Sequence, residues 1–69
     1  MQILENAKKM LNSGDYRKSL FMIKSILKIK PDHPEALYLS AVNWYHLEDK
    51  QRTHYYTEQL IRNNPSYSP

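Results

Sequence analysis

The sequence predicts an all-α protein built from two tandem helix–turn–helix units. Three observations support this prediction: apolar residues recur at steps of three and four, turn-forming residues separate the segments with that spacing, and similar residues recur 34 positions apart. The chain has 69 residues, which suits one small domain, so residues 1–69 are expected to form a single domain. No segment alternates with the period of two that marks a half-buried strand.

Four segments have the spacing of an amphipathic helix, and we expect antiparallel helices over roughly residues 2–12, 16–30, 34–46 and 50–63. The residues that define the four stripes are Ile3, Leu4, Ala7, Met10 and Leu11; Ser19, Met22, Ile23, Ile26 and Leu27; Leu37, Tyr38, Ala41, Trp44 and Tyr45; and Thr53, Tyr56, Thr57, Leu60 and Ile61. Each stripe lies on one helix face, so the helices can pack their apolar sides together.

Turn and capping residues lie between these segments. Gly14 can take the left-handed conformation that ends a helix, and Asp15 can cap the next helix. Asp32 and Glu35 have the spacing of a capping box. Pro34 lies between them. Proline is tolerated in the first turn of a helix because the N–H that it lacks would have no intrahelical acceptor there.

The chain repeats with a period of 34 residues, the distance from Pro31 to Pro65. The same offset relates Ala7 to Ala41, Leu11 to Tyr45, Asp15 to Asp49, Ser19 to Thr53 and Leu27 to Ile61. We place repeat one at about residues 1–33 and repeat two at about 34–67. Residues 65–69 look like the beginning of a further repeat.

In period and pattern the chain resembles the tetratricopeptide repeat family over nearly its whole length. The family's pattern positions are occupied by Ile3, Asn6, Ala7, Met10, Ser19, Ile23 and Pro31 in repeat one, and by Leu37, Ser40, Ala41, Trp44, Thr53, Thr57 and Pro65 in repeat two. Glu48 departs from the pattern because it replaces the turn glycine, and a left-handed Glu48 would cost about 1 kcal/mol. The resemblance implies a fragment of a right-handed α-solenoid.

No motif indicates catalysis or a cofactor. The sequence lacks a Gly-rich phosphate loop, a His-Glu-x-x-His motif, a nucleophile elbow and any cysteine. His33, His46 and His54 do not have the spacing of known metal ligands. We therefore expect a non-enzymatic protein without cofactor or metal.

The resemblance implies that the first helix of each unit lines a concave binding surface. The chain has six tyrosines and one tryptophan, and tyrosine combines contact area with a hydrogen-bonding tip. We expect a scaffold that binds a peptide, a helix or another copy of itself. The candidate groove residues are Leu4, Lys8, Leu11, Asn12, Glu35, Tyr38, Val42, Tyr45 and His46. Alternatively, the aromatic residues pack against a missing third repeat or a second chain.

Charge is distributed unevenly and suggests another function. Residues 1–31 carry seven Lys or Arg against two Asp or Glu, whereas residues 32–69 carry three against five. The basic residues of the second helix are Arg17, Lys18, Lys24 and Lys28. They form either a solvated face or the surface of an electrostatic adaptor for an acidic partner. Nucleic acid is not favoured, because no RNA-reading motif accompanies them.

Two further expectations follow from residues 50–69. The apparent start of another repeat suggests the N-terminal region of a larger enzyme, such as a glycosyl- or sulfotransferase. A two-repeat chain would instead leave the helix of residues 50–63 with an uncovered apolar side, and we would then expect a homodimer or larger self-assembly. No apolar run approaches the roughly 20 residues of a membrane span. The N-terminus lacks the pattern of a signal peptide, so a cytoplasmic location is expected.

Overall fold

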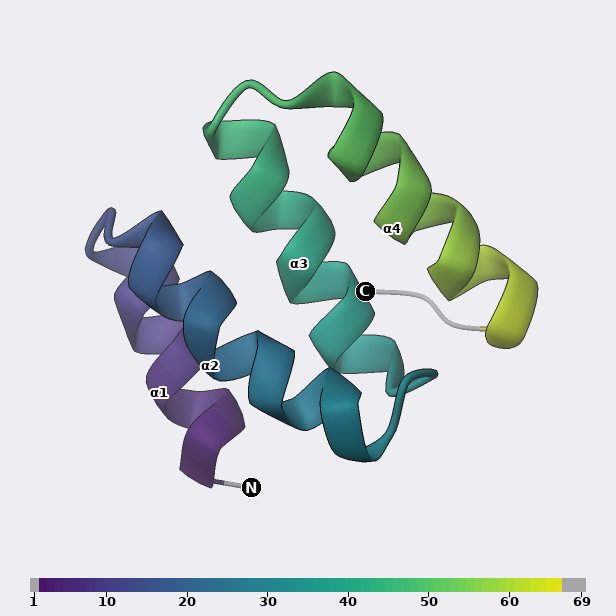
Figure 1. Cartoon of the computed structure of the whole chain (residues 1–69), viewed down its shortest axis with the longest axis horizontal. Helices are drawn as coiled ribbons and strands as arrows, with labels where there is room; N and C mark the ends of the chain where they lie inside the picture. The colour runs from purple at the N-terminus through teal and green to yellow at the C-terminus, as the bar shows by residue number, and fades with distance from the viewer. Residues whose placement is uncertain (1, 67–69) are drawn as a thin grey trace.

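The computed structural model describes residues 2–66, which form four α-helices and no strand (Figure 1). The helices are α1 (Gln2–Asn12), α2 (Tyr16–Ile29), α3 (Pro34–His46) and α4 (Lys50–Asn63). The all-α prediction is confirmed, and the predicted bounds agree to within one residue. Residues 67–69, which belong to the predicted start of a further repeat, lie outside the described residues.

Consecutive helices run in opposite directions and pack side by side, with α3 between α2 and α4 (Figure 1). The first unit, α1–α2, meets the second unit, α3–α4, mainly where α2 packs against α3. This central position explains why α3 contains the largest set of buried residues, namely Ala36, Leu37, Leu39, Ser40, Ala41 and Asn43. By contrast, α4 contributes only Leu60 to the buried residues.

The hydrophobic core lies where α1, α2 and α3 meet. Its members are Leu4, Ala7, Ile23, Ile26, Ala36 and Leu39, with Leu11, Met22, Leu27 and Tyr38 packed against them. Burial of each large aliphatic side chain stabilises the fold by roughly 1.5–3 kcal/mol. The small residues Ala7 and Ala36 are fully buried, which allows the helix backbones to approach closely.

Two buried polar side chains connect the same three helices. The Ser19 hydroxyl on α2 donates to the carbonyl oxygen of Ala7 on α1 at 2.8 Å. The Asn43 amide on α3 donates to Ser19 Oγ and to the carbonyl oxygen of Leu39, both at 2.9 Å. Ser19 and Asn43 are 0% exposed, so this chain of bonds lies entirely inside the protein.

The turns within the two units have the same hydrogen bonds, 34 residues apart. The amides of Gly14 and Asp15 donate to the last turn of α1, and those of Glu48 and Asp49 donate to the last turn of α3. Gly14 has φ of 86° and Glu48 has φ of 62°, so both take the left-handed conformation. The predicted helix stop at Gly14 is confirmed.

The helix caps agree with the sequence in one place and differ in another. Asp15 caps α2, as predicted, by accepting from the amide three residues on at 3.3 Å. The predicted cap at Asp32 is wrong. Because α3 begins at Pro34, the capping position falls on His33, whose Nδ1 accepts from the amide of Ala36 at 3.2 Å.

The left-handed residues provide a matched pair of stability tests. Glu48→Gly should raise the free energy of unfolding by up to about 1 kcal/mol, because glycine avoids the steric conflict of a left-handed side chain. Gly14→Ala should lower it by about 1 kcal/mol. A Cβ at residue 14 would meet nothing within 4 Å, so only the backbone conformation is tested. Thermal unfolding followed by circular dichroism measures both, and a lower melting temperature for Glu48→Gly would contradict the expectation.

The buried polar bonds can be tested by a double-mutant cycle in urea. Asn43→Ala should lower the free energy of unfolding by about 2–3 kcal/mol, because it removes buried hydrogen bonds and leaves a cavity. Ser19→Ala should lower it by about 1–2 kcal/mol. Because the two side chains bond to each other, the double variant should lose less than the sum, by about 0.5–3 kcal/mol. Simple additivity would show that the bond between them is energetically unimportant.

Candidate interaction surfaces

The structure assigns different positions to the groove residues predicted on α1. Leu4 is 7% exposed and Leu11 packs against the same core, so internal packing occupies both side chains. Lys8 Nζ lies 2.5 Å from Glu35 Oε2, an ion pair that joins α1 to α3. Asn12 is exposed at the end of α1. The α1 part of the predicted surface therefore presents mainly polar groups.

The residues predicted on α3 face in two directions. Tyr38, Val42 and Tyr45 line a groove shared with α4. His46 instead stacks on Tyr16 at the start of α2, with ring centroids 4.9 Å apart and an interplanar angle of 4°. The ring of Tyr45 meets His46 edge-on at 5.7 Å. The predicted set is thus divided among the core, the ion pair, the α4 side of α3, the contact of His46 with α2, and the exposed end of α1.

The groove between α3 and α4, here called the α3–α4 groove, has a volume of about 430 Å³. Its lining residues are Tyr38, Ala41, Val42, Tyr45, Thr53, Thr57, Leu60, Ile61, Asn64 and Pro65. Ala41 and Leu60 are buried, whereas Tyr45 is 69% and Ile61 is 61% exposed. Two large side chains are therefore open to solvent beside the buried Ala41 and Leu60.

This groove corresponds, position by position, to a covered surface of the first unit. Subtraction of 34 converts its lining residues into Leu4, Ala7, Lys8, Leu11, Ser19, Ile23, Ile26, Leu27, Lys30 and Pro31. In the first unit α3 packs on that surface, with Ala36 and Leu39 in the core and Asn43 bonded to Ser19. Among residues 2–66 no helix occupies the equivalent place on the second unit.

Two threonines give the groove its polar character. Thr53 Oγ1 donates to the carbonyl oxygen of Asp49 at 2.8 Å, and Thr57 Oγ1 donates to that of Thr53 at 2.7 Å. Each hydroxyl proton is therefore used within α4, while the oxygen can still accept. Thr53 is the counterpart of Ser19, which accepts from Asn43 in the first unit.

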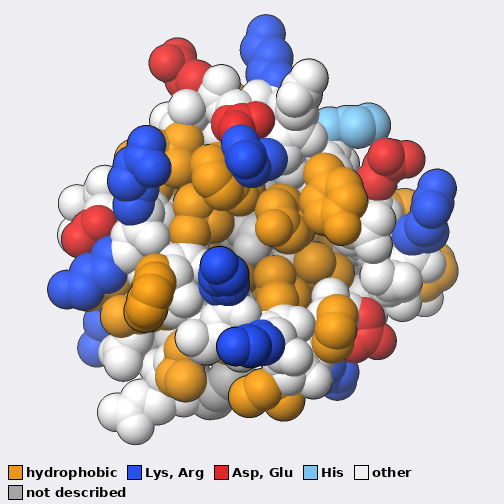
Figure 2. Space-filling model, viewed as in Figure 1, with side chains coloured by type: hydrophobic (Ala, Val, Ile, Leu, Met, Phe, Trp, Pro, Cys, Tyr) orange, Lys and Arg blue, Asp and Glu red, His pale blue; other side chains and the backbone are white. Residues whose placement is uncertain are grey.

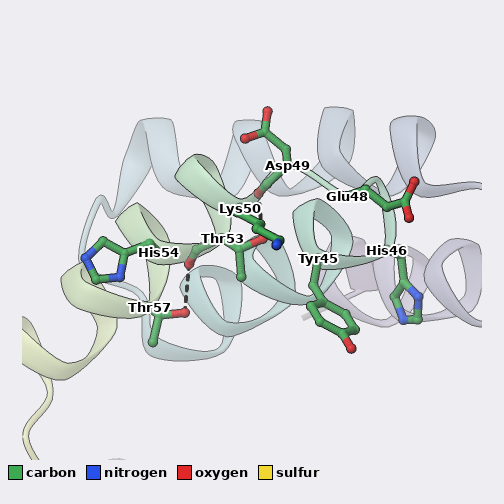
Figure 3. Close-up of a pocket in the computed structure, with 8 residues that line it drawn as sticks. All are labelled: Tyr45, His46, Glu48, Asp49, Lys50, Thr53, His54 and Thr57. Carbon is green, nitrogen blue, oxygen red and sulfur yellow. Dashed lines mark hydrogen bonds between the residues drawn. The ribbon is translucent and has the colours of Figure 1, made fainter.

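A polar depression continues the groove toward the turn between α3 and α4 (Figure 3). It is lined by Tyr45, His46, Glu48, Asp49, Lys50, Thr53, His54 and Thr57. The Asp49 carboxylate accepts from the backbone amide of Arg52 at 3.0 Å and from its guanidinium at 2.6 Å. These bonds, the backbone bond foremost, lower the pKa of Asp49 below its ordinary value and keep the α4 cap charged.

The side chains of the polar depression are not arranged as the ligands of a metal site. Within residues 2–66 no group of three or more His, Asp or Glu side chains is placed to hold a metal ion. His54 Nε2 instead lies 3.3 Å from Glu58 Oε2 on the same helix.

A second groove, here called the basic groove, lies over α2, α3 and α4 and is about 660 Å³ in volume. Its basic residues are Arg17, Lys24 and Lys28, and its apolar residues are Leu20, Phe21, Leu27, Trp44 and Tyr56. Figure 2 shows a face on which Lys and Arg side chains lie among hydrophobic ones. Sequence reasoning named the cations, but it missed the apolar residues that lie beside them. Lys18, the fourth predicted cation, is exposed but does not line the groove.

Comparisons with models of known protein families, with curated proteins and with solved structures give no match. None of the described helices is both long and apolar enough to cross a membrane. The two grooves and the internal repeat are therefore the features that indicate a function.

Proposed function

We propose that this chain is a tetratricopeptide-type scaffold that binds an amphipathic helix of a partner protein in the α3–α4 groove. One observation carries the proposal: the surface that α3 covers on the first unit is open on the second unit. On the first unit the equivalent surface is covered by a helix, so a helix is the occupant that we expect in the groove. Helix-in-groove recognition uses the same apolar packing as a helix pair inside a fold.

The contacts of α3 define the chemistry of the partner helix. α3 presents Ala36, Leu39 and Asn43 to the first unit, at relative positions i, i+3 and i+7. A partner with a small residue, a leucine and an amide side chain at this spacing could pack on Ala41. Its amide could then donate to Thr53 Oγ1, as Asn43 donates to Ser19.

A second copy of this chain is an alternative occupant. Head-to-tail stacking is not supported, because α1 has Gln2, Glu5 and Lys9 at the positions that correspond to Ala36, Leu39 and Asn43. Gln2, Glu5 and Lys9 are polar and exposed. Self-association would therefore join two α3–α4 grooves directly. In a longer enzyme, a following helix of the same chain would occupy the groove instead.

The direct test uses a labelled peptide of residues 34–47, the α3 helix with its C-terminal cap, as the probe for the intact chain. Fluorescence anisotropy should detect binding, and Tyr45→Ala with Ile61→Ala should weaken it at least tenfold, because exposed aromatic and aliphatic anchors carry most interface energy. Tyr55→Ala with Ile29→Ala is the matched control, since these exposed residues lie outside the groove. Unchanged affinity with unchanged helical circular dichroism would reject the α3–α4 groove.

Sedimentation equilibrium separates the second-copy alternative from the partner helix. If two grooves join directly, the chain should be dimeric at micromolar concentration and Ile61→Lys should make it monomeric, because a lysine would bury its charge in an apolar contact. A monomer at all concentrations would reject self-association and leave the groove free for a partner.

A further inference from the structure

We propose that the basic groove is a second, independent docking surface, which binds an acidic amphipathic helix of a partner protein. This inference goes beyond the function proposed above, because the basic groove and the α3–α4 groove share no lining residue. It rests on uncompensated positive charge and on the exposed Phe21 beside partly exposed apolar residues in the same groove.

The cations of the basic groove have no carboxylate partner among the described residues. No Asp or Glu is among the residues that line it. None of the salt bridges found within residues 2–66 involves Arg17, Lys24 or Lys28. Elsewhere in the protein, Lys8 and Arg52 each pair with carboxylates. A row of unpaired cations creates a positive potential that attracts a carboxylate-bearing partner.

One apolar side chain of the basic groove, Phe21, is strongly exposed, and the others are partly exposed. Phe21 is 73% exposed, although it lies on a helix that buries three other side chains. Trp44 is half-buried, and the guanidinium of Arg52 lies 4.7 Å from its ring centroid. Tyr56 completes the groove from α4. Aromatic residues beside basic ones are the composition typical of binding hot spots.

The spacing of the cations indicates the pattern of the partner. Along α2, Lys24 and Lys28 are separated by one turn, about 6 Å, and Arg17 lies two turns earlier, about 10 Å from Lys24. A helix lying antiparallel to α2 with acidic residues at positions i, i+4 and i+11 would match Lys28, Lys24 and Arg17 in turn. Its apolar stripe would then face Phe21 and Trp44. A single row of cations at the edge of an apolar groove favours this partner over the extended phosphate backbone of a nucleic acid.

The test uses an 18-residue helical peptide with a leucine stripe and Glu at i, i+4 and i+11, labelled for fluorescence anisotropy. Lys24→Glu with Lys28→Glu should weaken binding at least tenfold. Phe21→Ala should weaken it about tenfold. The matched charge control is Lys9→Glu with Lys50→Glu, which changes the net charge equally outside the basic groove and should change affinity less than threefold.

A milder charge variant and a variant of the α3–α4 groove separate the effect of charge from effects on folding. Because Glu at residue 28 would face the negative end of the α2 dipole, Lys24→Gln with Lys28→Gln provides a milder variant that should also weaken binding. Tyr45→Ala with Ile61→Ala should leave this affinity unchanged, which distinguishes the two grooves. Equal losses in the charge control, no effect of Phe21→Ala, or equally tight binding to single-stranded RNA or anionic phospholipid vesicles would each overturn the proposal.

Discussion

The hydrogen bond from Asn43 to Ser19 is the constraint on which the arrangement of the helices depends. An apolar seam alone would allow α3 to slide or rotate with a modest loss of contact, whereas a buried amide deprived of its partner costs about 1–3 kcal/mol. Ser19 also bonds to Ala7, so the position of α3 is fixed against both helices of the first unit. This orientation in turn directs Tyr38 and Tyr45 toward the groove shared with α4.

The second unit has the same architecture, but its second helix buries fewer side chains than the second helix of the first unit. Ile23, which is 1% exposed, corresponds to the exposed Thr57, and Ser19 corresponds to the partly exposed Thr53. Among the described helices, α4 buries the fewest residues, namely Leu60 alone. A partner in the α3–α4 groove would bury these exposed positions. It would also stabilise the fold, because a molecule that binds only the folded state stabilises it by mass action. The polar residues that α4 has at these positions keep the uncovered surface compatible with water while no partner is bound.

The helices could be predicted closely because their signals are local. Apolar spacing and the Gly14 turn define their bounds without reference to the rest of the chain. The cap at His33 was missed because histidine is an uncommon capping residue. The burial of Asn43 was missed for a different reason: a polar residue within a helix looks like a surface position until its partner, 24 residues away, is known. The basic groove combines residues of three helices, so its apolar half could not be recognised from the cations of α2 alone.

The two grooves differ in charge more than in apolar character. No charged residue lines the α3–α4 groove, whereas three cations and no carboxylate line the basic groove. An acidic helix gains electrostatic attraction only in the basic groove, and it would have to desolvate its carboxylates without compensation in the other. A neutral helix like α3 finds a matching apolar surface and a hydroxyl acceptor, Thr53, in the α3–α4 groove. Charge would therefore direct these two kinds of helix to different grooves, even though α3 and α4 form part of both surfaces.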